Sequence, residues 1–94
     1  MRAISRRAIR EYGKLHADCV PSLSNWLRLT RKAKWRNFAE LRADFGSADQ
    51  VGRRTVFNIG GNKYRLIARV NYRSQRVFIL HIMKHGEYVK GEWK

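Results

Sequence analysis

The chain has few of the residues that crosslink small proteins or balance their charge. Among its 94 residues it has one cysteine, one proline and seven acidic residues. Cys19 has no second cysteine for a disulfide or a metal site, so we interpret it as a small buried residue in a reducing compartment. No apolar run approaches the ~20 residues of a membrane-spanning helix. We therefore expect a soluble, cytoplasmic protein without a membrane partner.

The shortage of acidic residues leaves a large positive charge. Twenty-one lysines and arginines give a formal net charge of +14. This charge suits nucleic acid, an acidic protein or an anionic membrane surface as a partner. Because 44% of the residues are hydrophobic, a folded globule is favoured over a disordered basic tail. The length and the absence of repeats or linkers predict a single domain over residues 1–94.

The stretch 56–72 is typical of two antiparallel strands joined by a tight turn. Gly60, Gly61 and Asn62 accept the positive φ angles of such a turn. Alternation along the second strand separates an apolar face from a mainly cationic one. The first face contains Tyr64, Leu66, Ala68, Val70 and Tyr72, and the second contains Lys63, Arg65, Ile67, Arg69 and Asn71. A rigid sheet divided in this way can hold fixed positive charges over a polyanion.

Helical patterns precede this hairpin. Residues 1–4 could form an edge strand, and Ser5 suits the N-cap of the first helix. Helices are predicted over Arg6–His16, from Pro21 with a core stripe of Leu23, Trp26 and Leu27, and over Phe38–Asp44 with Asn37 and Glu40 as a capping box. The stretch 45–52, which is rich in small and polar residues, is predicted to be a loop.

A third strand is predicted after the hairpin, over Arg76–Met83. Both of its faces are largely apolar, which indicates a central strand packed by helices on one side. His81 alternates with core residues and is interpreted as a buried, hydrogen-bonded histidine. The polar segment from Lys84 to Tyr88 follows directly. Helices followed by antiparallel strands predict an α+β fold, with a small twisted antiparallel sheet and N-terminal helices on one face.

Four segments resemble the HigB family of toxins, part of the RelE-like superfamily of bacterial toxin–antitoxin systems. They are Trp35-Arg-Asn-Phe-Ala-Glu-Leu, Phe45-Gly-Ser-Ala-Asp, Val56-Phe-Asn-Ile-Gly-Gly-Asn-Lys-Tyr-Arg-Leu-Ile and His85-Gly-Glu-Tyr88. In the closing motif, this chain has Lys84 where the family pattern has threonine, and Val89 where it has aspartate. The resemblance implies a RelE-like fold and mRNA cleavage on translating ribosomes. It also implies silencing by a cognate HigA-type helix-turn-helix antitoxin, through which operator DNA would be contacted only indirectly.

The residue types favour RNA cleavage without a metal or other cofactor. The 2′-hydroxyl of RNA can attack the adjacent phosphate if a base, an acid and cations assist it. The acidic residues are scattered, and the histidines have no cysteine or paired carboxylate beside them. Arginine, in contrast, is abundant, and its planar fork matches phosphate oxygens. The expected products are a 2′,3′-cyclic phosphate and a 5′-hydroxyl.

Three residues are the candidates for catalysis. Arg65 is expected to hold the scissile phosphate, and His85 to act as acid or base, since imidazole has an unperturbed pKa of ~6.5. Tyr88 could stack on a base or hold a phosphate. Further RNA contacts are expected from Lys63, Arg69, Lys84, Arg53 and Arg54. Each candidate also has a structural interpretation: a solvated sheet face for the arginines, a capping or surface role for His85, and packing for Tyr88.

Two other functions are compatible with the sequence. A non-catalytic module could bind RNA phosphates on the basic sheet face without cleaving them. A DNA-associated accessory protein is less favoured, because no helix-turn-helix pair is evident.

Overall fold

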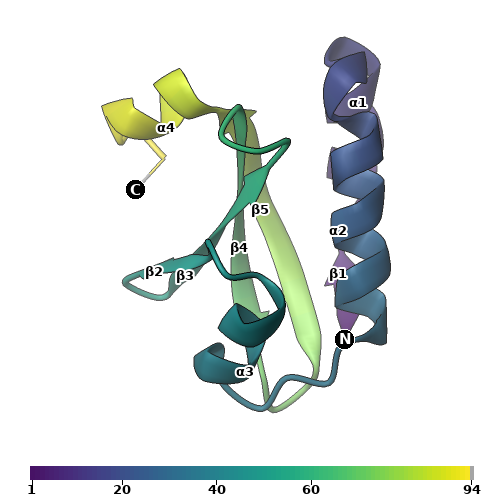
Figure 1. Ribbon diagram of the computed structural model, residues 1–94, viewed down its shortest axis with the longest axis vertical. Helices are drawn as coiled ribbons and strands as arrows, with labels where there is room; N and C mark the ends of the chain where they lie inside the picture. Colours follow the sequence, from purple (N-terminus) through teal and green to yellow (C-terminus); the bar gives the residue numbers. More distant parts are fainter. Residues whose placement is uncertain (94) are drawn as a thin grey trace.

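Helices lie on both sides of a five-stranded sheet, and the computed structural model describes residues 1–93 (Figure 1). The strands are β1 (Arg2–Ile4), β2 (Asp49–Val51), β3 (Arg54–Ile59), β4 (Tyr64–Asn71) and β5 (Arg76–Lys84). The helices are α1 (Arg6–Leu15), α2 (Val20–Lys32), α3 (Phe38–Asp44) and α4 (His85–Lys90), with a 3-10 turn, η1 (Ala17–Cys19), before α2. Among the described residues, no helix has both the length and the apolar character needed to cross a membrane.

The sheet has the strand order β1-β5-β4-β3-β2. β2, β3, β4 and β5 pair antiparallel in sequence order, whereas β1 pairs parallel with β5. The predicted α+β fold and the predicted edge strand at the start of the chain are therefore confirmed. The sheet is mixed rather than purely antiparallel, because the first strand lies beside the last one and points in the same direction.

The main core lies between the sheet and helices α1, α2 and α3. Edge-to-face aromatic contacts run through it, with ring centroids 5.3 Å apart for Trp26 and Phe57, 5.2 Å for Phe45 and Phe57, and 5.7 Å for Trp35 and Phe45. Trp26 is 1% exposed, so its predicted place in the core is confirmed. Aromatic pairs of this geometry add stabilisation beyond their buried area.

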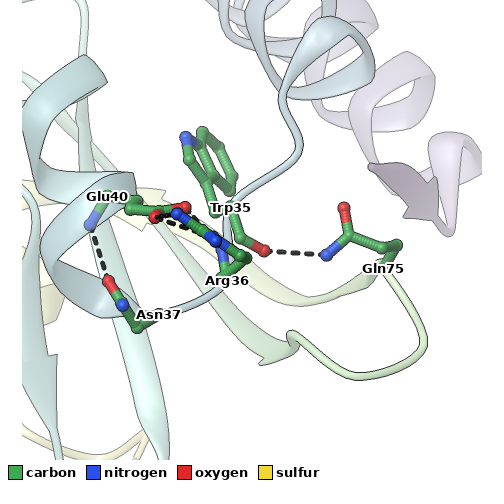
Figure 2. A network of polar contacts seen from close by, with 5 residues as sticks. All are labelled: Trp35, Arg36, Asn37, Glu40 and Gln75. Carbon is green, nitrogen blue, oxygen red and sulfur yellow. Dashed lines mark hydrogen bonds and ion pairs between the residues drawn. The ribbon is translucent and has the colours of Figure 1, made fainter.

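Local sequence signals correctly predict several boundaries of helices and strands. Gly60 and Gly61 have φ angles of 63° and 69°, the left-handed region in which glycine is favoured. At the start of α3 the side chain of Asn37 accepts a 2.9 Å hydrogen bond from the N–H of Glu40. The Glu40 carboxylate accepts from the N–H of Arg36 at 2.9 Å and pairs with its guanidinium (Figure 2). α1 begins where predicted, although Ser5 makes no side-chain capping hydrogen bond.

Two segments that were not predicted as secondary structure are regular. Asp49–Val51 lies in the expected loop but pairs with β3 as β2. The polar residues after β5 form α4, which ends at Gly91 with a φ of 74°. In Figure 1, α4 lies on the side of the sheet away from α1 and α2. There, Trp93 and Tyr88 pack on Val56 and Ile67 as a second, smaller core.

The interpretation of His81 as a core residue is wrong, because it is exposed. The cause is a bulge in β5. Ile67 pairs with His81 and the next residue, Ala68, pairs with Ile79, so Leu80 has no partner. An extra residue reverses the side-chain alternation beyond it. Before the bulge, Val77 and Ile79 face the main core; after it, Ile82 does, and His81 turns to the opposite face.

Candidate active site

The candidate active site lies where the β3–β4 turn meets the first turn of α4. His85 is the first residue of α4, and its N–H donates to the carbonyl of Lys63 in the turn at 2.9 Å. The N–H of Lys84 donates to the Glu87 carboxylate at 3.2 Å, which caps the same helix. These backbone contacts bring the C-terminal segment beside β4, although α4 follows the other strand, β5.

The guanidinium of Arg65 lies beneath α4, and Arg65 is 7% exposed. Its Nη1 donates to the carbonyls of Asn62 at 3.3 Å and Tyr64 at 3.1 Å. Its Nη2 donates to Oδ1 of Asn62 at 2.6 Å and lies 2.9 Å from Nδ1 of His85. The two terminal nitrogens carry four protons, so every one of these protons faces an acceptor. A phosphate can contact these two nitrogens only by displacing one of the acceptors.

The contact with Arg65 fixes the tautomer of His85. A guanidinium can only donate hydrogen bonds, so Nδ1 of the imidazole is the acceptor. In the neutral ring the proton then lies on Nε2. His85 is exposed, so this N–H is the group through which the imidazole can meet a substrate as a donor.

Two aromatic rings join Arg65 to Arg54 in a continuous stack. Cζ of Arg65 lies 5.6 Å from the ring centroid of Tyr88, and Tyr88 stacks on Trp93 with a centroid distance of 5.0 Å and an interplanar angle of 12°. Cζ of Arg54 lies 6.0 Å from the Trp93 ring centroid, and its Nη1 donates to the Trp93 carbonyl at 2.8 Å. Cations at these distances are attracted to the ring faces. The stack covers part of the sheet, where Tyr88 and Trp93 pack on Val56 and Ile67.

Because of this cover, the sheet face that was predicted to be cationic is only partly open to solvent. Arg65 and Ile67 lie on the predicted face, but both are buried, because α4 and Trp93 cover them. Arg54 and Tyr88 are half-buried. The other expected RNA contacts are exposed, namely Lys63 in the β3–β4 turn, Arg69 on β4, Lys84 at the end of β5 and Arg53 in the β2–β3 turn.

Two residues of the site were not selected from the sequence. Asn62 was assigned to shaping the hairpin, yet both its carbonyl and its side chain hold the Arg65 guanidinium. Trp93 was not considered, although it supports Tyr88 and its Nε1 donates to the Tyr88 carbonyl at 2.9 Å. A useful signal was present for Asn62, since a turn amide three residues before a strand arginine is within reach of its side chain.

The opposite face of β4 carries a tyrosine with a strongly altered pKa. The hydroxyl of Tyr64 donates to the Asp18 carboxylate, at 2.8 Å and 3.0 Å from its two oxygens. This hydrogen bond, together with burial, raises the pKa of Tyr64 to about 12. Burial is the main reason that the pKa of nearby Tyr12 is also raised to about 12.

Within residues 1–93 there is no group of three or more His, Cys, Asp or Glu residues that could hold a metal ion.

Comparison with known proteins connects this geometry with a family. Residues 19–91 match the sequence profile of the HigB toxin, described as the RelE-like toxic component of a toxin–antitoxin system. The chain belongs to this family. The match includes β2 to β5 and α4, and with them Arg65, His85 and Tyr88. The family resemblance seen in the sequence is thereby confirmed, and the family's toxic role implies a cognate antitoxin.

Curated relatives of similar length support the family assignment. The chain is 29% identical over 93 residues to the mRNA interferase HigB of Escherichia coli O6:H1, covering 96% of this chain and 90% of that protein. It is 29% identical over 91 residues to the mRNA interferase toxin HigB of Escherichia coli K12 and to the mRNA interferase HigB of Shigella flexneri. Each of these two alignments covers 94% of this chain and 88% of the relative.

Proposed function

We propose that this HigB-family protein is an mRNA endoribonuclease and that Arg65 and His85 form the centre of its active site. The observation that carries the proposal is the 2.9 Å contact between Arg65 Nη2 and His85 Nδ1, which joins a buried cation to an exposed imidazole. The proposal is further supported by the relatives, whose names identify them as mRNA interferases. The net charge of +14 suits an RNA substrate.

The reaction needs no group beyond RNA and protein side chains. The 2′-oxygen attacks the adjacent phosphorus, a bond forms between them, and the bond from phosphorus to the 5′-oxygen of the next nucleotide breaks. The 2′-hydroxyl gives its proton to solvent, and the departing 5′-oxygen receives one. The products are a 2′,3′-cyclic phosphate and a 5′-hydroxyl. Negative charge grows on the phosphate oxygens in the transition state, where fixed cations are most effective.

Within this reaction we assign the proton donor role to His85. Arg65 occupies Nδ1, so the imidazole presents Nε2–H to the leaving 5′-oxygen. The Arg65 cation offsets the negative charge that the ring takes on, and solvent then returns a proton to Nε2. The charge on the departing group is stabilised by the Arg65 cation next to the ring. Arg65 therefore both orients His85 and supplies positive charge from beneath α4, while exposed Lys63 and Lys84 can make direct phosphate contacts.

The proposed partners follow from the same charges. The mRNA is cleaved on the translating ribosome, where exposed cations such as Arg69 and Arg53 also meet ribosomal RNA. The protein acts in the cytoplasm and is silenced by its cognate antitoxin, which either covers the active site with acidic side chains or prevents entry to the ribosome. Catalysis requires no metal ion bound by the protein.

A cleavage assay on translating ribosomes tests this function. The wild-type protein is added in the presence of a chelator that removes transition metals but leaves ribosomal magnesium in place, and mRNA ends are mapped. We expect new 5′-hydroxyl ends and undiminished cleavage. Expression of the chain alone is expected to stop growth, and co-expression of its antitoxin to restore it. Intact mRNA, together with normal growth at high levels of folded protein, would contradict the nuclease and favour a module that binds RNA without cleaving it.

A further inference from the structure

A basic hollow lies at the other end of β5 from the candidate active site. It has a volume of about 800 Å³ and is formed by β1, the first turn of α1, the end of α2, the segment that follows α2, and the β4–β5 turn. Its lining residues are Met1, Arg2, Ala3, Arg6, Arg31, Lys34, Arg36 and Gln75. Five of these are lysine or arginine and none is acidic. A concave surface lined by one sign of charge concentrates its field on a ligand of the opposite sign.

Most of this charge has no counterion in the protein. Arg36 pairs with Glu40, at 3.0 Å between Nη2 and Oε2. Within residues 1–93, the side chains of Arg2, Arg6, Arg31 and Lys34 have no ion-pair partner. Four uncompensated cations thus share one hollow, three of them arginines, whose planar fork matches phosphate oxygens in a bidentate way.

The positions of these cations are unfavourable for the fold alone. Arg6 lies in the first turn of α1, which contains no acidic residue, so its charge faces the positive end of the helix dipole. Arg2 on β1 is in register with Arg76 on the neighbouring parallel strand β5, so two like charges lie on adjacent strands without a counterion between them in the described part of the chain. An anion bound in the hollow would relieve the repulsion of Arg6 and Arg2.

The wall of the hollow is held in place by neutral hydrogen bonds. Gln75 donates through Nε2 to the carbonyls of Trp35 at 2.7 Å and Tyr72 at 2.8 Å. Figure 2 shows the Gln75 side chain directed at the Trp35 carbonyl, with Arg36 beside Glu40 on the adjoining segment. The β4–β5 turn is thereby fixed to the chain that follows α2, which keeps Gln75 in the lining before any ligand binds.

We propose that this hollow binds the phosphate backbone of RNA at a site separate from the one that is cleaved. β5 has nine residues, so its two ends lie on the order of 25 Å apart at ~3.3 Å per residue. One nucleotide cannot reach both places. The hollow therefore holds a second RNA segment and orients the protein on it, while Arg65 and His85 act at the other end. This inference rests on the proposed function for the identity of the ligand as RNA.

Two variants with equal loss of charge test the proposal. The first, Arg2→Gln/Arg6→Gln/Lys34→Gln, changes the hollow. The matched control, Arg10→Gln/Lys14→Gln/Arg42→Gln, removes three exposed cations elsewhere on α1 and α3. Binding to a hairpin RNA with a single-stranded flank is followed by fluorescence anisotropy over a series of salt concentrations. Circular dichroism and thermal melting establish that both variants are folded.

We expect the hollow variant to bind RNA more weakly and its log–log salt slope to become shallower by about 2, because three phosphate contacts on a single strand are lost. The control should keep a slope close to that of the wild type. In a cleavage assay the hollow variant should raise KM more than it lowers kcat, whereas His85→Ala should lower kcat and keep the slope.

Equal slopes for the two triple variants would overturn the inference and leave the nuclease assignment intact. Unchanged RNA binding together with loss of antitoxin binding by the hollow variant would also overturn it, and would identify the occupant as an acidic protein segment. If the wild type and its variants all cleave no RNA but the slope difference persists, the proposed function fails while the second RNA site stands.

Discussion

Nη2 of Arg65 lies 2.9 Å from Nδ1 of His85, although one residue is on a central strand and the other begins the last helix. The contact fixes which imidazole nitrogen carries the proton and ties the position of α4 to β4. It therefore links the proposed chemistry to the fold, and it gives the sharpest tests of both.

The first prediction concerns the donor role of His85. His85→Ala should lower cleavage by roughly 100-fold or more, the usual scale for a lost proton-transfer group. Replacing the scissile 5′-oxygen by sulfur gives a leaving group that needs no proton, so this substrate should be cleaved by His85→Ala at nearly the wild-type rate. Single-turnover rates on the two substrates provide the measurement. An equal defect on both would assign His85 to the base role instead.

The second prediction concerns the guanidinium of Arg65. Arg65→Lys keeps a charge but cannot hold Asn62 and His85 together, so cleavage should fall strongly while ribosome binding changes little. Arg65→Ala should also lower the free energy of unfolding by about 1–3 kcal/mol, because buried acceptors lose their donor. Urea unfolding and ribosome co-sedimentation measure these effects. Wild-type cleavage by Arg65→Lys would show that charge alone suffices and that orientation of the imidazole is unimportant.

The third prediction concerns salt. With about six phosphates neutralised on a single strand, the RNA affinity of the wild-type protein should have a log–log salt slope near −4. Anisotropy titrations with a labelled single-stranded RNA measure it. A flat response between low and physiological ionic strength would refute an affinity based on the lysines and arginines.

The fourth prediction concerns alkaline stability. The folded-state pKa values of Tyr64 and Tyr12 are raised from 10.0 to about 12. In that interval the unfolded chain loses these protons while the folded protein retains them. Their contribution is therefore complete below about pH 10 and is lost as the pH rises towards about 12. Urea midpoints should fall over this range, and Tyr64→Phe should make the fall shallower. An identical pH dependence in Tyr64→Phe would exclude Tyr64 as a contributor.

The parts of the fold that could be predicted from the sequence are those specified by neighbouring residues. Gly60 and Gly61 specify their turn through backbone conformation, and Asn37 specifies the start of α3 through one local hydrogen bond. The apolar face of β4 follows from strict alternation, and its residues do lie in the main core or against it. For such features, local physics and tertiary structure agree.

The features that were missed depend on distant partners. α4 is short and polar, and it is held by packing of Tyr88 and Trp93 on the far side of the sheet. β2 has three residues and exists because β3 pairs with it. The burial of Arg65 follows from the placement of α4, so a face that looks cationic in the sequence is partly covered. Arg65 and His85 do lie in contact, while their roles in catalysis stay predictions.

The unpaired Leu80 in β5 determines which face of the sheet each following side chain occupies. With the residue in place, Val77 and Ile79 face the helices and Met83 faces α4 and its small core. If Leu80 instead paired with Ile67 in an unbroken ladder, each later side chain would turn to the other layer. Ile82 would leave the main core, and α4, which begins with His85, would start from the opposite face of the sheet. The bulge at Leu80 therefore sets the face from which α4 begins, and with it the contact between the imidazole and the guanidinium.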